Sequence, residues 1–311
     1  MSPDTRRTIS IVSPCYNDAE NVRICHAEVR ALFDGPLAEF RREHIFADNA
    51  SSDETVAVLA EIAAADKDVR VIFNARNVGV LRSTFNALQA ASGDATVAML
   101  AVDLQDPPEM IAKFAAEWKA GADVVYGVRA KRDEGAAMLA LRGAFYRMMT
   151  KLANIPIPVD VGEFQMIDRR VREFVCRNQD HHPYIRGLIA DAGFKRVGIA
   201  YAYRARARGL SKNRFLGLLD IAVNGILTFT RLPLRLLALA GAVLVAAGSA
   251  TMLYGAFDTL QTFLVGLGLA VGGLNIVATG LVGEYTMMVH DQIRLGGAVP
   301  EKGRLNFEAK P

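Results

Sequence analysis

Three clusters of polar side chains each follow a short apolar run of the sequence. They are Ser13–Asp18, Asp48–Asp53 and Asp103–Glu109. If the apolar runs are parallel strands, their carboxyl ends meet at one edge of a sheet and the clusters gather there. Neither a G-x-G-x-x-G motif nor a G-x-x-x-x-G-K-S/T motif accompanies them, which excludes a Rossmann dinucleotide site and a P-loop. An edge lined by carboxylates instead suits a base or ribose together with a divalent cation.

Asp103 ends the apolar run that precedes the third cluster. A carboxylate at the end of a buried strand is costly unless it is paired or bound to a metal ion. Mg²⁺ and Mn²⁺ prefer hard oxygen ligands and often bridge a carboxylate and a diphosphate. Asp103 and the carbonyl of Gln105 are therefore candidate ligands for Mg²⁺ or Mn²⁺. The alternative is that Asp103 caps a helix that begins near Pro107.

Apolar runs alternate with segments of helical character along the first part of the chain. The predicted strands are Thr8–Ser13, Ile45–Asp48, Arg70–Phe73, Thr96–Asp103 and Asp123–Gly127, and two of the predicted helices are Ala19–Phe33 and Ser52–Ala65. Alternation at the spacing of βαβ units predicts an α/β fold with an open, mostly parallel sheet. Ligands of such sheets bind beyond the carboxyl ends of the strands, where the three polar clusters fall.

The composition excludes several other classes of protein. A hydrophobic content of 51% rules out intrinsic disorder. Cys15, Cys25 and Cys176 are odd in number and have no paired spacing, so we expect neither a disulfide framework nor a zinc site. Met1–Thr8 is polar and basic and leads straight into an apolar strand, so we expect no secretory signal and a cytosolic N-terminal part. We expect no nucleic-acid partner.

Two long uncharged stretches lie near the C-terminus, Leu236–Phe257 with 22 residues and Thr259–Gly283 with 25. At about 1.5 Å per residue, each can cross the roughly 30 Å hydrocarbon core of a bilayer. They predict two transmembrane helices, and the alternative is a pair of buried helices in a large soluble core. The cations that flank the pair are Arg231, Arg235, Arg294 and Lys302. The link at Asp258 has none, so the positive-inside bias predicts a hairpin with both ends in the cytosol.

The segment Phe215–Leu232 is apolar at most positions but contains Asp220, Asn224 and Arg231. This pattern predicts an interfacial helix on the membrane surface, and the alternative is a connector helix packed on the soluble domain. Glycines in the second span would suit close helix contact and self-association into a homo-oligomer. The predicted domains are a cytosolic domain at residues 1–210, the interfacial helix at 211–233, the transmembrane hairpin at 234–285 and a cytosolic tail at 286–311. This organisation predicts a multi-pass protein of the inner (cytoplasmic) membrane.

Taken together, these motifs resemble those of the family 2 glycosyltransferases with a GT-A fold. The similar pieces are Ser13–Asn17 (SPCYN), Asp48–Asp53, Arg76–Gly79 (RNVG), Asp103–Glu109 (DLQDPPE), Asp160–Arg169 (DVGEFQMIDR) and Gly209–Lys212 (GLSK). DLQDPPE followed by paired C-terminal spans resembles the branch of the family that acts on polyprenyl phosphates, such as dolichol-phosphate mannosyltransferases and undecaprenyl-phosphate glucosyltransferases. The resemblance covers nearly the whole chain and implies a GT-A-like catalytic, nucleotide-sugar-binding domain over residues 1–210.

The resemblance also implies roles for individual residues. Those expected to bind the nucleotide sugar are Pro14, Tyr16, Asn17, Asp48, Asn77, Gly79 and Asp103, with Asp103 and Gln105 as ligands of the metal ion. Those expected to act in catalysis are Asp103, Asp160 and Glu163. The sequence departs from the family pattern in two motifs: Ala101 replaces the first carboxylate of the usual D-x-D, and Glu163 and Gln165 replace the aspartate and the arginine of the acceptor loop.

The stretch Lys195–Arg214 carries seven Lys or Arg residues and no Asp or Glu. Each cation near an anionic lipid surface contributes on the order of 1 kcal/mol to membrane attraction. The candidates for binding a lipid phosphate are Arg204, Arg208, Ser211 and Lys212. The alternative is that these residues serve a general attraction to anionic membrane lipids.

The sequence and the resemblance together predict an inverting glycosyltransferase. It would move a hexose from a nucleotide diphosphate sugar, by analogy a UDP-sugar, to polyprenyl (undecaprenyl or dolichyl) phosphate at the cytosolic membrane face. A phosphate monoester has its second pKa at about 6, so the acceptor arrives largely as a dianion and Glu163 or Asp160 would position it rather than deprotonate it. Two alternatives stay open: a membrane-anchored glycosyltransferase with a non-lipid acceptor, and a catalytically impaired nucleotide-sugar-binding protein, suggested by Ala101.

Overall fold

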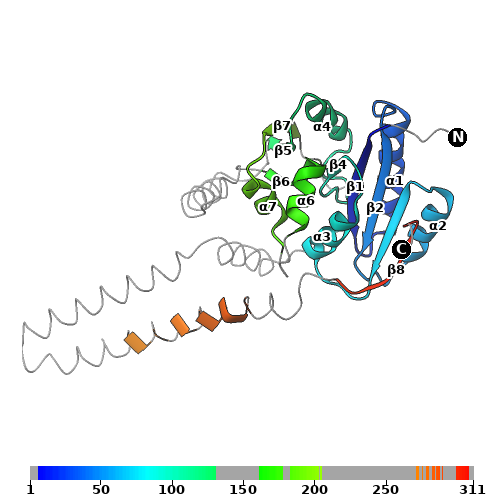
Figure 1. Ribbon diagram of the computed structural model, residues 1–311. Coiled ribbons are helices and arrows are strands. Elements are labelled where there is room, and N and C mark those ends of the chain that lie inside the picture. The colour runs from blue at the N-terminus through cyan, green and yellow to red at the C-terminus, as the bar shows by residue number, and fades with distance from the viewer. Residues whose placement is uncertain are drawn as a thin grey trace, which may run out of the picture. The chain divides into compact units, whose positions relative to one another are not determined.

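The structure is a computed structural model. It describes residues 6–130, 161–177, 183–202, 204 and 299–307, together with scattered helical residues between 271 and 289. The chain divides into two compact units, Met1–Tyr146 with Ile155–Lys212 and Gly296–Pro311, and Arg147–Asn154 with Asn213–Leu295. All strands of the described part belong to the first unit (Figure 1).

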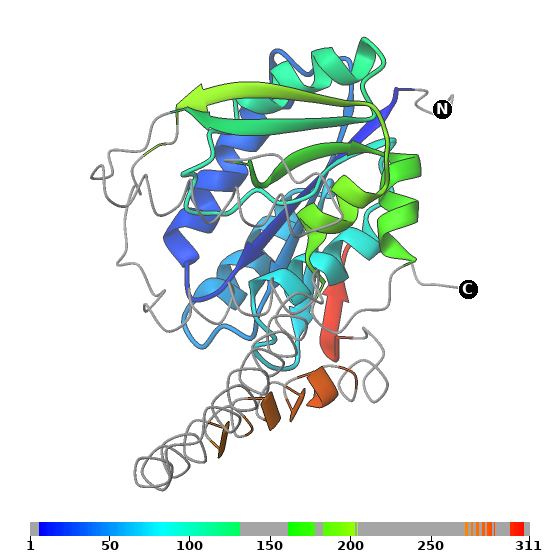
Figure 2. The same cartoon turned by 90° about the vertical axis from the view of Figure 1, so that its left-hand side faces the viewer.

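The first unit is built on one sheet, whose strands in the described residues follow the order β7-β5-β6-β4-β1-β2-β3-β8. Their bounds are β1 Thr8–Cys15, β2 Arg41–Asp48, β3 Val69–Asn74, β4 Ala95–Val97, β5 Val124–Ala130, β6 Val161–Asp168, β7 Arg196–Ala202 and β8 Glu301–Leu305. Strands β6 and β8 are antiparallel to their neighbours, and the other six run in one direction. Figure 2 shows β8 and β7 at opposite ends of the sheet.

Helices cover both faces of this sheet. Their bounds are α1 Ala19–Asp34, α2 Thr55–Ala65, α3 Val80–Ala90, α4 Met110–Lys119, α6 Arg169–Cys176 and α7 Ile185–Asp191. Side chains alternate across β1: Ile9 and Ile11 pack in a cluster with α1, α2 and α4, whereas Val12 packs in another with α3. Helices α6 and α7 share a further cluster with Phe85 of α3. The predicted α/β class with a mostly parallel sheet is therefore confirmed.

The predicted strand over Thr96–Asp103 is wrong in its extent, because β4 ends at Val97. Beyond this point only isolated bonds to the neighbouring strands remain, from the Leu100 N–H to the Val12 carbonyl at 2.8 Å and from the Ala98 N–H to Gln165. Ala98, Leu100 and Val102 are nevertheless buried. The apolar run thus reflects burial in the core rather than strand pairing. Five residues, 98–102, separate the end of β4 from Asp103.

The described residues of the second unit are helical, with the Thr279 hydroxyl bonded to the Asn275 carbonyl at 2.8 Å. Their side chains include four exposed apolar ones, Val271, Val282, Met287 and Val289. Within the residues that the structure describes, no helix has the length and apolarity needed to cross a membrane. The predicted interfacial helix at 211–233 and most of the predicted hairpin at 234–285 lie outside the described residues.

The C-terminal strand β8 completes the sheet by pairing antiparallel with β3. The Ala75 N–H donates to the Pro300 carbonyl at 2.8 Å. The amide of Asn306, whose φ is 57°, donates to the carbonyls of Ala63 and Val69 at 2.7 and 2.8 Å. Part of the predicted tail at 286–311 is therefore a sheet element, beside the loop that follows β3.

We expect Asn306→Ala to destabilise the fold, because it removes two short hydrogen bonds, together about 1–3 kcal/mol, and forces alanine into a left-handed conformation. The melting temperature of the full chain in detergent measures the effect. Asn306→Gly separates the two causes, since glycine accepts the backbone conformation but supplies no side-chain bonds. A glycine variant as stable as the parent would show that these bonds contribute nothing.

Candidate functional site at the carboxyl edge of the sheet

Three loops at the carboxyl edge of the sheet contain a non-glycine residue with positive φ. These are Asn17 after β1, Ala50 after β2 and Leu104 beyond β4, with φ of 51°, 63° and 51°. The fourth such residue in the described part of the chain is Asn306. Such conformations persist only where surrounding contacts enforce them, and they concentrate at functional sites. The three polar clusters predicted from the sequence are therefore the strained loops of the fold.

Side-chain hydrogen bonds tie the first two loops together. The Asn17 N–H donates to the Ser51 hydroxyl at 2.9 Å, and the Ser52 N–H donates to the Asn17 side-chain oxygen at 2.7 Å. The carboxylate of Asp48 is buried and accepts the Ser51 N–H at 3.2 Å. Asn17 and Asp48, both predicted to bind the nucleotide sugar, thus fix the shape of the loops.

Asn49 connects these loops to the one that follows β3. Its side-chain amide donates to Asn77 Oδ1 at 2.9 Å, and its side-chain oxygen accepts the Val78 N–H at 2.9 Å. The Asn77 oxygen also accepts the Gly79 N–H at 3.0 Å. Asn77 and Gly79, which were predicted to bind the nucleotide sugar, therefore hold the conformation of this loop through their hydrogen bonds. Asn49 was within a predicted cluster but was not singled out, because its position in the sequence does not show that it faces Asn77.

A cavity of about 130 Å³ opens among these loops. The residues that line it are Pro14, Cys15, Tyr16, Asp18, Asn49, Val80, Ala101, Val102 and Asp103. It therefore brings together the predicted Pro14, Tyr16 and Asp103 from segments nearly ninety residues apart. Tyr16 is 39% exposed, so its ring could stack on a flat ligand in the cavity.

The segment Asp103–Gln105 forms a tight turn at this cavity. The Asp103 carboxylate is half-buried and accepts the Gln105 N–H at 3.3 Å. The Gln105 carbonyl accepts the Arg204 N–H at 2.9 Å. Helix α4 begins at Met110, so the alternative that Asp103 caps a helix near Pro107 is wrong.

The oxygen atoms of Asp103 and Gln105 fit a hard divalent cation. Within the described residues, no group of three His, Cys, Asp or Glu side chains could hold a metal ion by itself. Ala101, which lines the cavity, supplies no second carboxylate. A cation at Asp103 would therefore complete its coordination with water and with oxygen atoms of a bound ligand, as Mg²⁺ does at phosphate sites.

Glu163 lies on β6 and is not among the residues that line the cavity. It accepts the Arg186 N–H at 3.1 Å, and its other oxygen is 3.6 Å from Arg186 Nε. Burial raises the pKa of the Glu163 carboxyl, against the opposing effect of Arg186. Gln165 is buried and donates to the Gly162 carbonyl at 3.0 Å. Asp160, the other predicted catalytic carboxylate, lies outside the described residues.

Of the predicted lipid-phosphate ligands, Arg204 is described by the structure. Its Nη2 donates to both carboxylate oxygens of Glu109, at 2.8 and 2.9 Å, and its Nη1 is 3.6 Å from Glu28. The charge of Arg204 is thus compensated by carboxylates of the chain itself. Arg208, Ser211 and Lys212 lie outside the described residues.

A buried polar network, which was not predicted from the sequence, lies beside the turn at Asp103. Asp106, which is 3% exposed, accepts hydrogen bonds from Arg129 Nη2 to both oxygens at 3.2 Å and from the Tyr201 hydroxyl. Arg129 Nε also donates to the Tyr201 oxygen at 3.2 Å. Asp106 is the second acid of DLQDPPE, which was a usable signal. Arg129 and Tyr201 end strands without any motif of their own.

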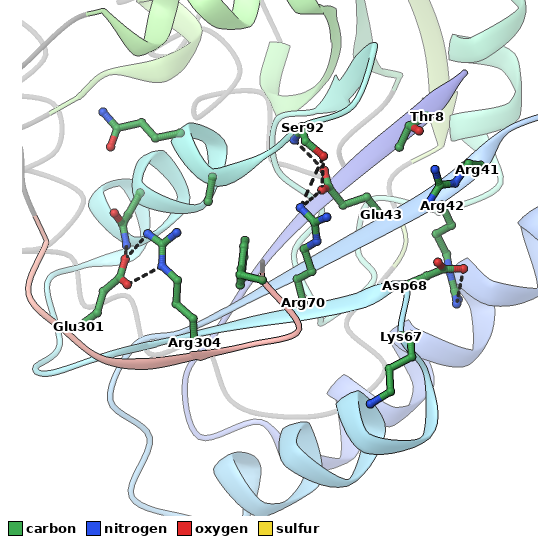
Figure 3. A pocket seen from close by; sticks show the side chains of 14 residues that line it. Thr8, Arg41, Arg42, Glu43, Lys67, Asp68, Arg70, Ser92, Glu301 and Arg304 are labelled. Atoms are coloured by element: carbon green, nitrogen blue, oxygen red, sulfur yellow. Dashed lines mark hydrogen bonds and ion pairs between the residues drawn. The ribbon is translucent and has the colours of Figure 1, made fainter. Parts of the chain in front are cut away.

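A larger cavity of about 970 Å³ starts at the opposite edge of the sheet (Figure 3). Its lining includes the first residues of β1 and β2 and two ion pairs, Arg70 with Glu43 and Arg304 with Glu301. None of the residues predicted for the site lines it. We therefore assign the chemistry to the smaller cavity at the carboxyl edge.

Comparisons with known proteins identify the family of this chain. Residues 10–175 match the family model described as Glycosyl transferase family 2. The uncharacterized glycosyltransferase YkcC of Bacillus subtilis is 31% identical, over 92% of this chain and 90% of that protein. The prophage bactoprenol glucosyl transferase homolog of Escherichia coli is 30% identical over 89% and 92%.

A similar solved structure is that of glucosyl-3-phosphoglycerate synthase from Mycobacterium tuberculosis in complex with Mn²⁺, UDP and glucosyl-3-phosphoglycerate. It aligns with a TM-score of 0.47 and 20% identity, and the alignment covers 70% of this chain and 76% of that chain.

Gly79 provides a test of the strained site loops. Its φ of 84° and ψ of 157° fall in a region that only glycine adopts readily, although a Cβ there would meet no atom within 4 Å. We expect Gly79→Ala to lower the free energy of unfolding by about 1–3 kcal/mol through backbone strain alone. Gly303→Ala is the matched control, since its Cβ also meets nothing and its backbone is extended. Equal melting temperatures of the two variants would contradict the expectation.

Glu163 predicts a pH dependence of stability. Its pKa is raised above the ordinary value of 4.5, so the folded chain favours the neutral carboxyl. The stability this provides is fully present below the ordinary pKa and is lost as the pH rises through the raised value. Glu163→Gln has no carboxyl to ionise and does not lose this stability. The melting temperature of the variant, relative to that of the parent, should therefore increase as the pH rises from roughly 4 to roughly 8. A difference that stays constant with pH would contradict the assignment.

Proposed function

Because this chain belongs to glycosyl transferase family 2, we propose that it transfers a hexose from a UDP-sugar to polyprenyl phosphate, in the undecaprenyl or dolichyl form. The observation that carries the proposal is a relative named as a bactoprenol glucosyl transferase homolog, 30% identical over 89% of the chain. That match extends well beyond the family domain at residues 10–175, which by itself makes the chain a glycosyltransferase.

The nucleotide sugar donor would occupy the cavity at the carboxyl edge. Pro14 and the exposed ring of Tyr16 would contact the base, and Asp103 lines the same cavity. Asn17, Asp48, Asn77 and Gly79 would act through the loops that they hold in shape. This placement follows the general rule that ligands of open parallel sheets bind beyond the strand ends.

Asp103 and Gln105 would hold Mg²⁺ or Mn²⁺ against the diphosphate of the donor. The bound cation supplies charge neutralisation of the nucleoside diphosphate as it leaves. The protein's own contribution is to fix Asp103 at the cavity wall beside the apolar Val102, where electrostatic interactions are stronger than in bulk water.

The acceptor would attack the anomeric carbon from the side opposite the leaving group, which inverts the configuration. Since its phosphate is largely a dianion near neutral pH, it needs no strong base. Glu163 holds the Arg186 backbone and side chain, so we propose that it positions the acceptor loop, together with Asp160. Arg208, Ser211 and Lys212 would bind the lipid phosphate.

We place the reaction at the cytosolic face of the inner (cytoplasmic) membrane, with residues 1–210 as the catalytic domain. The interfacial helix at 211–233 and the hairpin at 234–285 would hold this domain at the lipid surface, and glycines of the hairpin would support a homo-oligomer. The exposed apolar side chains at Val271, Val282, Met287 and Val289 support a lipid environment for this unit.

The lipid acceptor is tested by supplying the purified chain with a radiolabelled UDP-sugar, with and without undecaprenyl phosphate. We expect label to enter the organic phase only when the lipid is present. Label that stays in the aqueous phase on a soluble product would indicate the alternative, a membrane-anchored enzyme with a non-lipid acceptor. An inactive parent that still binds nucleotide would indicate an impaired binding protein, the possibility raised by Ala101.

Asp103→Asn should lower the rate of transfer by about 100-fold or more, because a neutral amide holds a divalent cation less tightly than a carboxylate and the leaving diphosphate would lose its charge neutralisation. The same transfer assay over a range of Mn²⁺ concentrations measures the loss. Asp34→Asn is the matched control, since the Asp34 side chain is 72% exposed at the end of α1. An Asp103→Asn variant as active as this control would remove Asp103 from the proposed mechanism.

A further inference from the structure

The loop Asp103–Glu109 is held from outside by the segment that leaves β7. Within four residues this segment makes three connections to the loop. The Tyr201 hydroxyl donates to Asp106, the Arg204 N–H donates to the Gln105 carbonyl at 2.9 Å, and the Arg204 guanidinium donates to both oxygens of Glu109. One short segment thus contacts the loop at its middle and at its end.

The connection at Asp106 is built into the core. Asp106 and Tyr201 are 3% and 5% exposed, so the buried carboxylate depends on its partners Arg129 and Tyr201. The fold leaves room for both partners. A Cβ at Gly127 would lie 2.5 Å from the Tyr201 ring, and one at Gly162 would lie 2.9 Å from Arg129 Nη2.

The loop needs such external contacts, because its own backbone is strained. Leu104 has a φ of 51°, a conformation that a branched side chain adopts only under constraint from its surroundings. It lies between Asp103, which lines the cavity, and Gln105, whose carbonyl receives the Arg204 N–H. Releasing the β7 segment would therefore allow the Asp103 turn to relax away from the cavity.

We propose that the exit of β7 is a clamp that holds the Asp103 turn in its donor-binding conformation, with Tyr201, Arg204 and Asp106 as positioning residues. This rests on the proposed function, in which the donor diphosphate and its cation lie at Asp103. In this role Arg204 acts through Gln105 and Glu109 rather than on the lipid phosphate. The same segment lies within the basic stretch Lys195–Arg214, whose later residues Arg208 and Lys212 are proposed to bind the lipid phosphate.

Tyr201→Phe tests the clamp with the loss of one oxygen atom, because the ring still fills the space beside Gly127. Isothermal titration of the full chain in detergent with UDP and Mn²⁺ measures donor-side binding without turnover. We expect the dissociation constant to rise about fivefold or more, and the KM for the donor to rise with little change in the KM for the acceptor. Tyr126→Phe on β5 is the matched control, and its affinity should equal that of the parent.

A merely structural role makes a different prediction. It would lower the melting temperature of Tyr201→Phe without ligand and leave the affinity for UDP and Mn²⁺ unchanged, which would overturn the proposal. Glu109→Gln and Arg204→Gln extend the test at the exposed end of the clamp. If the pair acts as a unit, the double variant should weaken UDP binding by less than the product of the two single effects.

The outcomes also separate the clamp from the proposed function. Normal binding of UDP by the parent, weakened in Tyr201→Phe, supports the clamp even if no label reaches undecaprenyl phosphate. Transfer of label to the lipid with unchanged UDP affinity in every variant supports the function and overturns the clamp. A parent chain that binds neither UDP nor GDP with Mn²⁺ overturns both.

Discussion

The parallel pairing of β4, β1, β2 and β3 is the constraint on which the site depends. Because these strands run in one direction, the loops that follow them leave the sheet at the same edge. There they meet, and short side-chain bonds such as that from Asn49 to Asn77 replace the ladder that has just ended. The positive φ values of Asn17, Ala50 and Leu104 occur at this edge because the chain must turn sharply while its polar groups remain bonded.

The carboxylates at the two edges of the sheet differ in burial and in hydrogen bonding. At the amino edge, Glu43 is 4% exposed and accepts hydrogen bonds from the Ser92 N–H and hydroxyl as well as an ion pair from Arg70. Such a closed network stabilises the fold and presents little to a ligand. At the carboxyl edge, Asp103 is half-buried and lines a cavity. This contrast explains why the larger cavity is not the one to which we assign the chemistry.

The fold could be predicted from the sequence wherever burial and pairing coincide. Val12 and Ile45 lie in strands that are buried on both faces, so a continuous apolar run marked them. Burial and strand pairing do not coincide at Leu100, which is buried but lies beyond the end of β4. They do not coincide at β8 either, whose EKGRL sequence is polar because the strand pairs at an exposed edge of the sheet. Local periodicity cannot report β8, since its partner β3 is more than two hundred residues away.

The site could likewise be predicted only in part from the sequence. Motif spacing located Tyr16 and Asp103, because each directly follows a run that enters the core. It did not locate Asp106, Arg129 and Tyr201, whose proximity arises only when β5 and β7 pair and their ends reach the loop beyond β4. Motifs marked residues that line the cavity as well as residues such as Asn17 and Asp48 that hold the loops in shape. They did not show which residues from distant strands would contact these loops, because those contacts form only in the folded chain.

Ala101 gives this distinction a consequence for the chemistry. With alanine at position 101 instead of a second carboxylate beside Asp103, the affinity for the proposed cation would depend more on how rigidly Asp103 is held than on the number of charges. A strained turn at Leu104, tied by Arg204 to Gln105 and bordered by the buried Asp106, limits the positions that Asp103 can adopt. Preorganisation of this kind lowers the reorganisation needed when the donor binds. Rigidity of the turn would therefore compensate in part for the missing carboxylate at position 101 in the proposed cation site.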